Sequence, residues 1–148
     1  MIKSISCVAL GIFFLTASVV HAEEKFPLTV RIILGKKTGN EVDPRLKDLV
    51  REFGALKFSS YSLHHEAHFD LQTGAAARVG LTDGTSAQVL VKGLAGERLR
   101  LEISVEKKNI KATVAVAAGA TVVIRGPDIP NGAMIIVITR PTTEPTAP

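Results

Sequence analysis

Apolar and polar residues alternate along most of the chain, and this period of two predicts β-strands. Every second residue of "FPLTVRIILGK" is apolar from Phe26 to Leu34, which predicts a first strand with one wholly apolar face. The alternation returns from Leu99 to Val105, with charged or polar residues between the apolar ones. The final segment, "AMIIVITR", is apolar at nearly every position, which predicts a central strand or a strand covered on both faces.

One segment, "DPRLKDLVREFGAL" at residues 43–56, follows a helical period instead. Asp43 is expected to cap the first backbone amides, and Pro44 to occupy the first helical position. The apolar stripe of this predicted helix consists of Leu46, Leu49, Val50, Phe53 and Leu56. We expect the stripe to pack on a sheet.

Turn signals divide the rest of the chain at intervals of about 8 to 12 residues, as in a meander. The clearest is "TDGT" at residues 82–85, whose Asp-Gly pair is typical of a tight hairpin. The sequence therefore predicts an α+β fold that is mostly β. One N-terminal strand and one amphipathic helix precede an antiparallel meander of six or seven strands, arranged as a small sandwich or a helix-covered sheet.

Both ends of the chain differ from the middle. A lysine, an apolar run and the tripeptide "VHA" predict a cleavable signal peptide over residues 1–22, which contains the single cysteine, Cys7. Residues 141–148 alternate proline with threonine and are expected to form a disordered tail. This leaves a single β-rich domain at residues 23–140, thiol-free, periplasmic or secreted, and with no integral membrane span after signal cleavage.

The charge of the chain is mildly basic, with a formal net charge of +4. The basic residues are dispersed and do not alternate with aromatic ones, which argues against nucleic acid as a partner. Five of them lie at strand positions from which they would share one sheet face: Arg78, Lys92, Arg98, Arg100 and Lys111. Such a face is either simply solvated or meets an anionic partner.

The most concentrated chemistry is "YSLHHEAHFDL" at residues 61–71, with three histidines and a glutamate within five positions. The apolar positions fit a strand better than a helix. One face would then carry Leu63, His65, Ala67, Phe69 and Leu71, and the other His64, Glu66, His68 and Asp70. The spacing of "HEAH" also differs from the zinc signature HExxH, which requires a helix.

A metal site on this strand would use His64, Glu66 and His68, with zinc or copper as the ion. His64 and His68 would stand roughly 13 Å apart at the backbone, whereas either histidine would stand roughly 7 Å from Glu66. A further ligand would have to come from a neighbouring strand. Two alternatives remain: a solvated polar face, and a face that gains charge in a mildly acidic compartment and so alters partner binding.

No catalytic constellation emerges from the sequence. The serines lack a nucleophile-elbow motif and three of the four histidines lie together on one strand, so we expect no enzyme activity. "GKKTGNEVD" likewise lacks the residue order of a phosphate-binding loop.

Two resemblances extend this interpretation. The order "VDPRLKDLVREF", "FSSY", a meander and "ATVAVAAGATVVIRGPDIPNGAMIIVITRP" resembles a group of small exported bacterial proteins of unassigned activity. Residues 112–141 are also similar to the C-terminal end of the secretin domain, although Arg125 replaces a glycine there and the membrane-inserting segment is reduced to "PDIPN". The second resemblance implies a shared hairpin, and no functional residue is carried over.

These observations favour a non-catalytic, exported protein of the cell envelope that acts as a protein-binding or assembly module. Its protein partner is expected to meet an edge strand, where backbone amides and carbonyls are unpaired. An accessory component of a secretion or envelope machine is one alternative. A metal- or pH-responsive module that uses the His/Glu strand face is the other.

Overall fold

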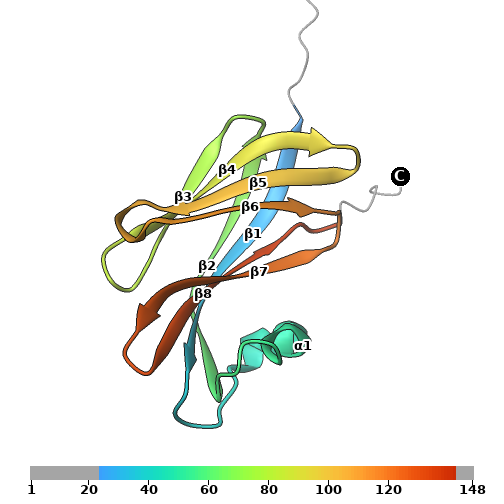
Figure 1. Ribbon diagram of the computed structural model, residues 1–148. Coiled ribbons are helices and arrows are strands. Elements are labelled where there is room, and N and C mark those ends of the chain that lie inside the picture. The colour runs from blue at the N-terminus through green and yellow to red at the C-terminus, as the bar shows by residue number, and fades with distance from the viewer. Residues whose placement is uncertain (1–23, 143–148) are drawn as a thin grey trace, which may run out of the picture.

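The computed structural model describes residues 24–142, which form a sandwich of two four-stranded antiparallel sheets (Figure 1). The strand order is β2-β1-β8-β7 in the first sheet and β3-β4-β5-β6 in the second. The strands are β1 (Lys25–Lys36), β2 (Ser60–Gln72), β3 (Ala76–Gly80), β4 (Ser86–Ala95), β5 (Arg98–Val105), β6 (Ile110–Val116), β7 (Thr121–Ile129) and β8 (Gly132–Thr139).

This architecture confirms the predicted fold class, because one strand and one short helical segment precede a series of antiparallel strands. The predicted signal peptide and residues 143–148 of the predicted tail lie outside the described residues. Within residues 24–142, the helices are too short and too polar to span a membrane.

The predicted helix is shorter and tighter than its sequence pattern suggested. It begins with the 3₁₀ helix η1 (Pro44–Leu49) and ends with one α-helical turn, α1 (Val50–Phe53). Leu46, Leu49 and Phe53 are buried as expected, but the assignment of Val50 to the buried stripe was wrong, since Val50 is 52% exposed. The three-residue period of a 3₁₀ helix aligns Leu46 with Leu49 and turns Val50 toward solvent.

Two hydrophobic clusters hold the layers together. The inner cluster lies between the sheets and includes Leu28, Ile32, Val89 and Leu101. The outer cluster lies between the first sheet and the helical segment, and it consists of Ile33, Leu46, Leu49, Phe53, Tyr61, Ile135 and Val137. Burial of these side chains is the main stabilising contribution to the fold.

Strand β8 belongs to both clusters and confirms the prediction that the last strand is central. It pairs with β1 on one side and with β7 on the other. Its residues 133–138 are all fully buried, and residues 134–138 alternate between the two clusters. At its start, Gly132 lies so close to β1 that a Cβ atom there would clash with the Gly35 carbonyl oxygen.

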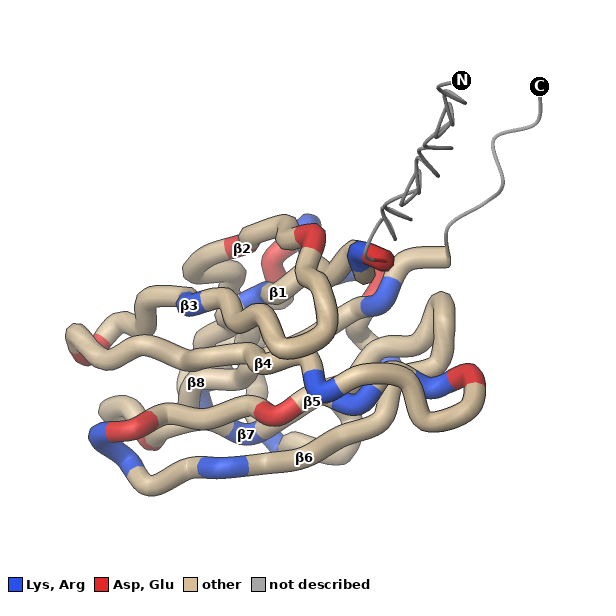
Figure 2. The backbone as a smooth tube through the Cα atoms, turned by 90° about the horizontal axis from the view of Figure 1, so that it is seen from above, with Lys and Arg blue, Asp and Glu red and all other residues tan. Residues whose placement is uncertain are grey.

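The loops that change sheets determine which edges lie together. The β2–β3 and β6–β7 connections each pass from one sheet to the other. As a result, β2 and β3 lie on one side of the sandwich and β6 and β7 on the other (Figure 2). The predicted hairpin at residues 82–85 joins β3 to β4, where Asp83 accepts hydrogen bonds from the hydroxyl and the backbone N–H of Thr85, which lower the pKa of Asp83.

Candidate functional site

A β-bulge rearranges the histidine-rich strand. Ile33 pairs with Leu63 and Ile32 with His65, so His64 has no partner on β1. The prediction that Leu63 shares a face with His65 was therefore wrong: Leu63 packs on the outer cluster, whereas Phe69 and the other apolar residues near the end of β2 pack on the inner one. The extra residue of a bulge reverses the alternation of side chains along the strand.

The bulge also separates His64 from the other two predicted ligands. His64 and His65 line a shallow depression of about 250 Å³ together with Gly80 and Leu81, and neither a serine nor a carboxylate lines it. Over residues 24–142, no three His, Cys, Asp or Glu side chains come close enough to hold a metal ion. Of the predicted set, only Glu66 and His68 come together, with His68 Nε2 at 3.7 Å from Glu66 Oε1.

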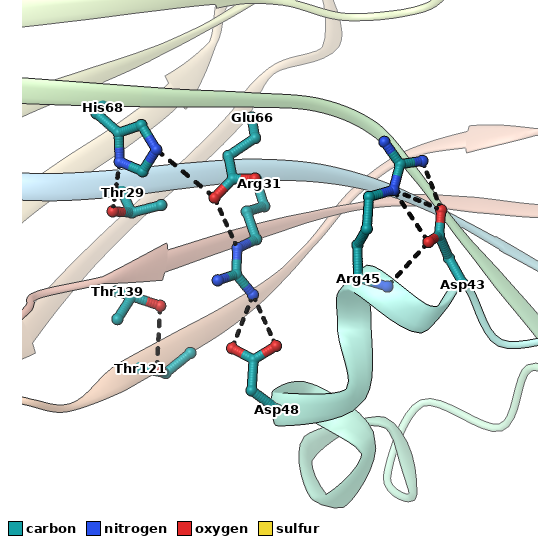
Figure 3. A network of polar contacts seen from close by, with 9 residues as sticks. All are labelled: Thr29, Arg31, Asp43, Arg45, Asp48, Glu66, His68, Thr121 and Thr139. Atoms are coloured by element: carbon teal, nitrogen blue, oxygen red, sulfur yellow. Dashed lines mark hydrogen bonds and ion pairs between the residues drawn. The ribbon is translucent and has the colours of Figure 1, made fainter.

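Glu66 and His68 belong to a polar network that joins the helical segment to the sheet (Figure 3). Arg31 on β1 is the centre of this network. Its Nη1 donates to both carboxylate oxygens of Asp48 in η1, at 3.1 and 2.8 Å, and its Nε lies 3.4 Å from Glu66 Oε1. His68 Nδ1 in turn lies 3.0 Å from Thr29 Oγ1.

The geometry of this network fits a structural role better than a chemical one. The Arg31 side chain is only 16% exposed, and its contact with Glu66 is an ion pair that leaves Nε without a hydrogen-bond acceptor. Because Asp48 is 56% exposed and His68 is 73% exposed, water screens the outer members of the network. The network orients the helical segment over the sheet.

A second set of polar contacts covers the start of the β2 edge, at Tyr61 and Leu63. The segment Glu41–Asp43 runs beside β2, with hydrogen bonds from Tyr61 N to Glu41 O at 3.0 Å and from Asp43 N to Tyr61 O at 2.9 Å. The Asp43 carboxylate accepts from the side chain of Arg45, from its backbone N–H and from Leu63 N. These bonds, that of the Arg45 side chain first, hold the pKa of Asp43 far below its ordinary value.

Three of the four sheet edges carry features that oppose pairing with another strand. β2 has its bulge, the covering segment and charged side chains, and β3 is only five residues long and has Arg78 at its centre. β7 has a register shift over Gly126 and Pro127, and proline has no N–H to donate. Bulges, short strands, charges and proline are the usual protections of a sheet edge.

Among residues 24–142, nothing protects the edge of β6 in these ways. Its seven residues, "IKATVAV", pair with β5 in unbroken register, and Lys111 is the one charged residue among them. At its end the Val116 carbonyl accepts a hydrogen bond of 3.1 Å from Arg140 Nη1, which leaves residues 110–115 as the open part of the edge. Turn signals at 107–109 and 118–119 delimit this segment in the sequence, but no sequence signal shows that it lies at an edge.

Half-buried aliphatic side chains accompany this open edge. Ile110 and Val114 on β6, and Val122 and Ile124 on β7, pack against the inner cluster while remaining partly exposed. At one end of this row, Ile110 also lines a groove of about 420 Å³ beside Pro127. We call residues 110–115 with Val122 and Ile124 the β6–β7 side. It offers unpaired backbone groups and apolar contact, which an extended segment requires.

The predicted basic face lies on the surface of the second sheet that is turned away from the inner cluster. Arg78, Arg98 and Arg100 are exposed, and alternate residues of the same strands are buried in the inner cluster. Glu102 lies among the cations, 3.1 Å from Lys92 Nζ and 3.3 Å from Lys111 Nζ. These two lysines lower the pKa of Glu102, and Glu102 in turn neutralises part of the face.

Comparisons of the chain with protein-family models, with curated proteins and with solved structures give no match.

Proposed function

We propose that the chain is a non-catalytic, exported module of the cell envelope that binds a protein partner by strand addition at the β6–β7 side. The signal-peptide pattern of residues 1–22 supports the export part of this proposal. The observation that carries the binding role is the contrast among the edges: β6 is regular and open, whereas β2, β3 and β7 are protected.

An incoming strand at β6 would gain two kinds of contact. Its backbone would pair with the open groups of residues 110–115, and every second side chain would cover the half-buried Ile110 and Val114. Backbone pairing supplies affinity with little dependence on sequence, and the alternate apolar side chains supply selectivity. An accessory role in a secretion or envelope machine is a special case of the same proposal.

The metal- or pH-responsive alternative has narrower support. It rests on the contact between Glu66 and His68, which would strengthen when His68 is protonated. A metal site would need a third ligand from another segment, since His64 is turned away from the pair by the bulge.

Affinity purification tests the proposal with a pair of matched variants. The tagged chain is cross-linked in the cells that export it and purified from envelope extract as wild type, Val114→Lys and Ala76→Lys. Val114→Lys places a charge on the inner side of the open edge, whereas Ala76→Lys places the same charge at the opposite edge of the same sheet.

We expect an envelope protein to co-purify with wild type and with Ala76→Lys, and to be lost with Val114→Lys. Circular dichroism of all three purified chains checks that each remains folded. If the captured proteins are the same for all three folded chains, binding at β6 is excluded. If none of them captures a protein and the chain purifies as a monomer, the binding role itself is contradicted.

A further inference from the structure

We propose that the strand which pairs with β6 is β6 of a second copy of this chain, in an antiparallel register centred on Thr113. The inference rests on the proposed function, because it names the partner of the same open edge. It arises from the sequence of β6, whose inner and exposed positions keep their faces when the strand is reversed about Thr113.

The register follows from the two faces of the strand. Paired residues of an antiparallel ladder lie on the same face, so β6 can pair with itself only between residues separated by an even number of positions. A pairing centred on Thr113 keeps Ala112 opposite Val114 of the second copy on the inner face. It also uses the open part of the edge and avoids the Val116 carbonyl, which Arg140 already occupies.

The side chains in this register are compatible. Lys111 stands opposite Ala115, so the one charge of the strand meets a small neutral residue and never its own copy. The two Thr113 residues stand opposite each other on the exposed face, where threonine pairs contribute favourably. By contrast, β3 paired with itself about its centre would place Arg78 against Arg78 and would be repulsive.

The second copy also supplies apolar contact to the half-buried aliphatic residues of the β6–β7 side. Its own Ala112 and Val114 continue the inner row of aliphatic side chains across the two-fold axis, and each copy covers the half-buried residues of the other. The contact is isologous, as expected of a two-fold dimer. Because five residue pairs form a small interface, we expect a reversible dimer with a dissociation constant of about 1 to 100 μM.

Single cysteines test the register directly, in a chain whose Cys7 is replaced by serine so that each introduced thiol is the only one. In the proposed register the two Thr113 Cα atoms stand about 5 Å apart, within the range of a disulfide. The two Ala115 Cα atoms are offset by four positions and stand roughly 13 Å apart. Ala76→Cys, at the β3 edge, is the control that measures disulfide formation by random collision of two chains.

Under mild oxidation at micromolar concentration, we expect Thr113→Cys to form a covalent dimer at least about ten times as readily as Ala115→Cys or Ala76→Cys. Cross-linking of Thr113→Cys at the level of Ala76→Cys would overturn the proposal. Equal cross-linking of Thr113→Cys and Ala115→Cys would overturn the register.

Sedimentation equilibrium provides a second measurement that introduces no thiol. Val114→Lys is expected to weaken association at least tenfold, and Ala76→Lys to leave it unchanged. If the wild type stays monomeric while Val114→Lys still loses a captured envelope protein, the second-copy proposal fails and the binding role stands. If the dimer forms in the Thr113 register, the partner is a second copy whether or not another protein is captured.

Discussion

The change Leu46→Ala is expected to destabilise the fold strongly, whereas Val50→Ala is expected to have almost no effect. Leu46 is fully buried in the outer cluster, and Val50, four residues later, is 52% exposed. Truncation of a fully buried leucine costs about 3 kcal/mol through lost burial and the cavity left behind. In a domain of this size, each 1 kcal/mol lowers the melting temperature by about 4 °C, so Leu46→Ala should melt roughly 12 °C below wild type.

Urea unfolding, followed by two probes, measures this difference. Far-ultraviolet circular dichroism reports on the sheets, and tyrosine fluorescence reports on the outer cluster, because the chain has one tyrosine and no tryptophan. That tyrosine, Tyr61, stacks on Phe53 with ring centroids 4.0 Å apart. Equal losses of stability in Leu46→Ala and Val50→Ala would refute the 3₁₀ geometry that sets the buried face. Fluorescence that changes well before the dichroism in wild type would show that the helical segment undocks on its own.

Three further predictions concern other parts of the molecule. Gly132→Ala should lower the free energy of unfolding in urea by about 3 kcal/mol, because its Cβ would clash with a backbone oxygen of β1. Gly80→Ala should change it by less than about 0.5 kcal/mol, because its Cβ would meet no atom within 4 Å. Equal effects of the two variants would contradict the close approach of Gly132 to β1. Zinc at micromolar concentration should bind wild type no more tightly than His64→Ala/His68→Ala, because the described residues gather no three ligands, and a histidine-dependent calorimetric isotherm would contradict this. The folded state lowers the pKa of Asp43, so the ionised carboxylate stabilises the fold at a pH above its ordinary pKa of 3.8, and this stabilisation is lost as the pH falls through and below that value. The variant Asp43→Asn should therefore be less stable than wild type at pH 7 and should lose less stability on acidification. Parallel pH profiles of the melting temperature in the two proteins would refute this role of Asp43.

The strands of this fold could be predicted from sequence because a strand with one buried face has an apolar residue at every second position. The alternation from Phe26 to Leu34 corresponds to the inner face of β1, and the apolar run at residues 133–138 corresponds to a strand buried on both faces. The assignment of each strand to one of the two sheets could not be predicted from this periodicity. It depends on whether a given turn reverses the chain within one sheet or leads it to the other.

The candidate site was harder to predict, for two physical reasons. A bulge inserts one residue without any mark in the polarity pattern, so the alternation that placed His64 with Glu66 and His68 fails at His64 itself. The edge of β6 is open because no other described strand pairs with it there, which depends on the sheet order. The sequence of β6 alone is that of an ordinary half-buried strand. The 3₁₀ winding of η1 was likewise not predicted, because the apolar residues of this segment were interpreted with 3.6 residues per turn.

Strand β8 has a consequence for the order of events after synthesis. It is the last strand in chain order within residues 24–142, yet it lies between β1 and β7 and contributes to both clusters. Until residues 133–138 leave the ribosome, β1 and β7 have no strand between them and neither cluster can close. A chain that stops before residue 133 would therefore leave the apolar faces of β1 and β7 without the strand that joins them.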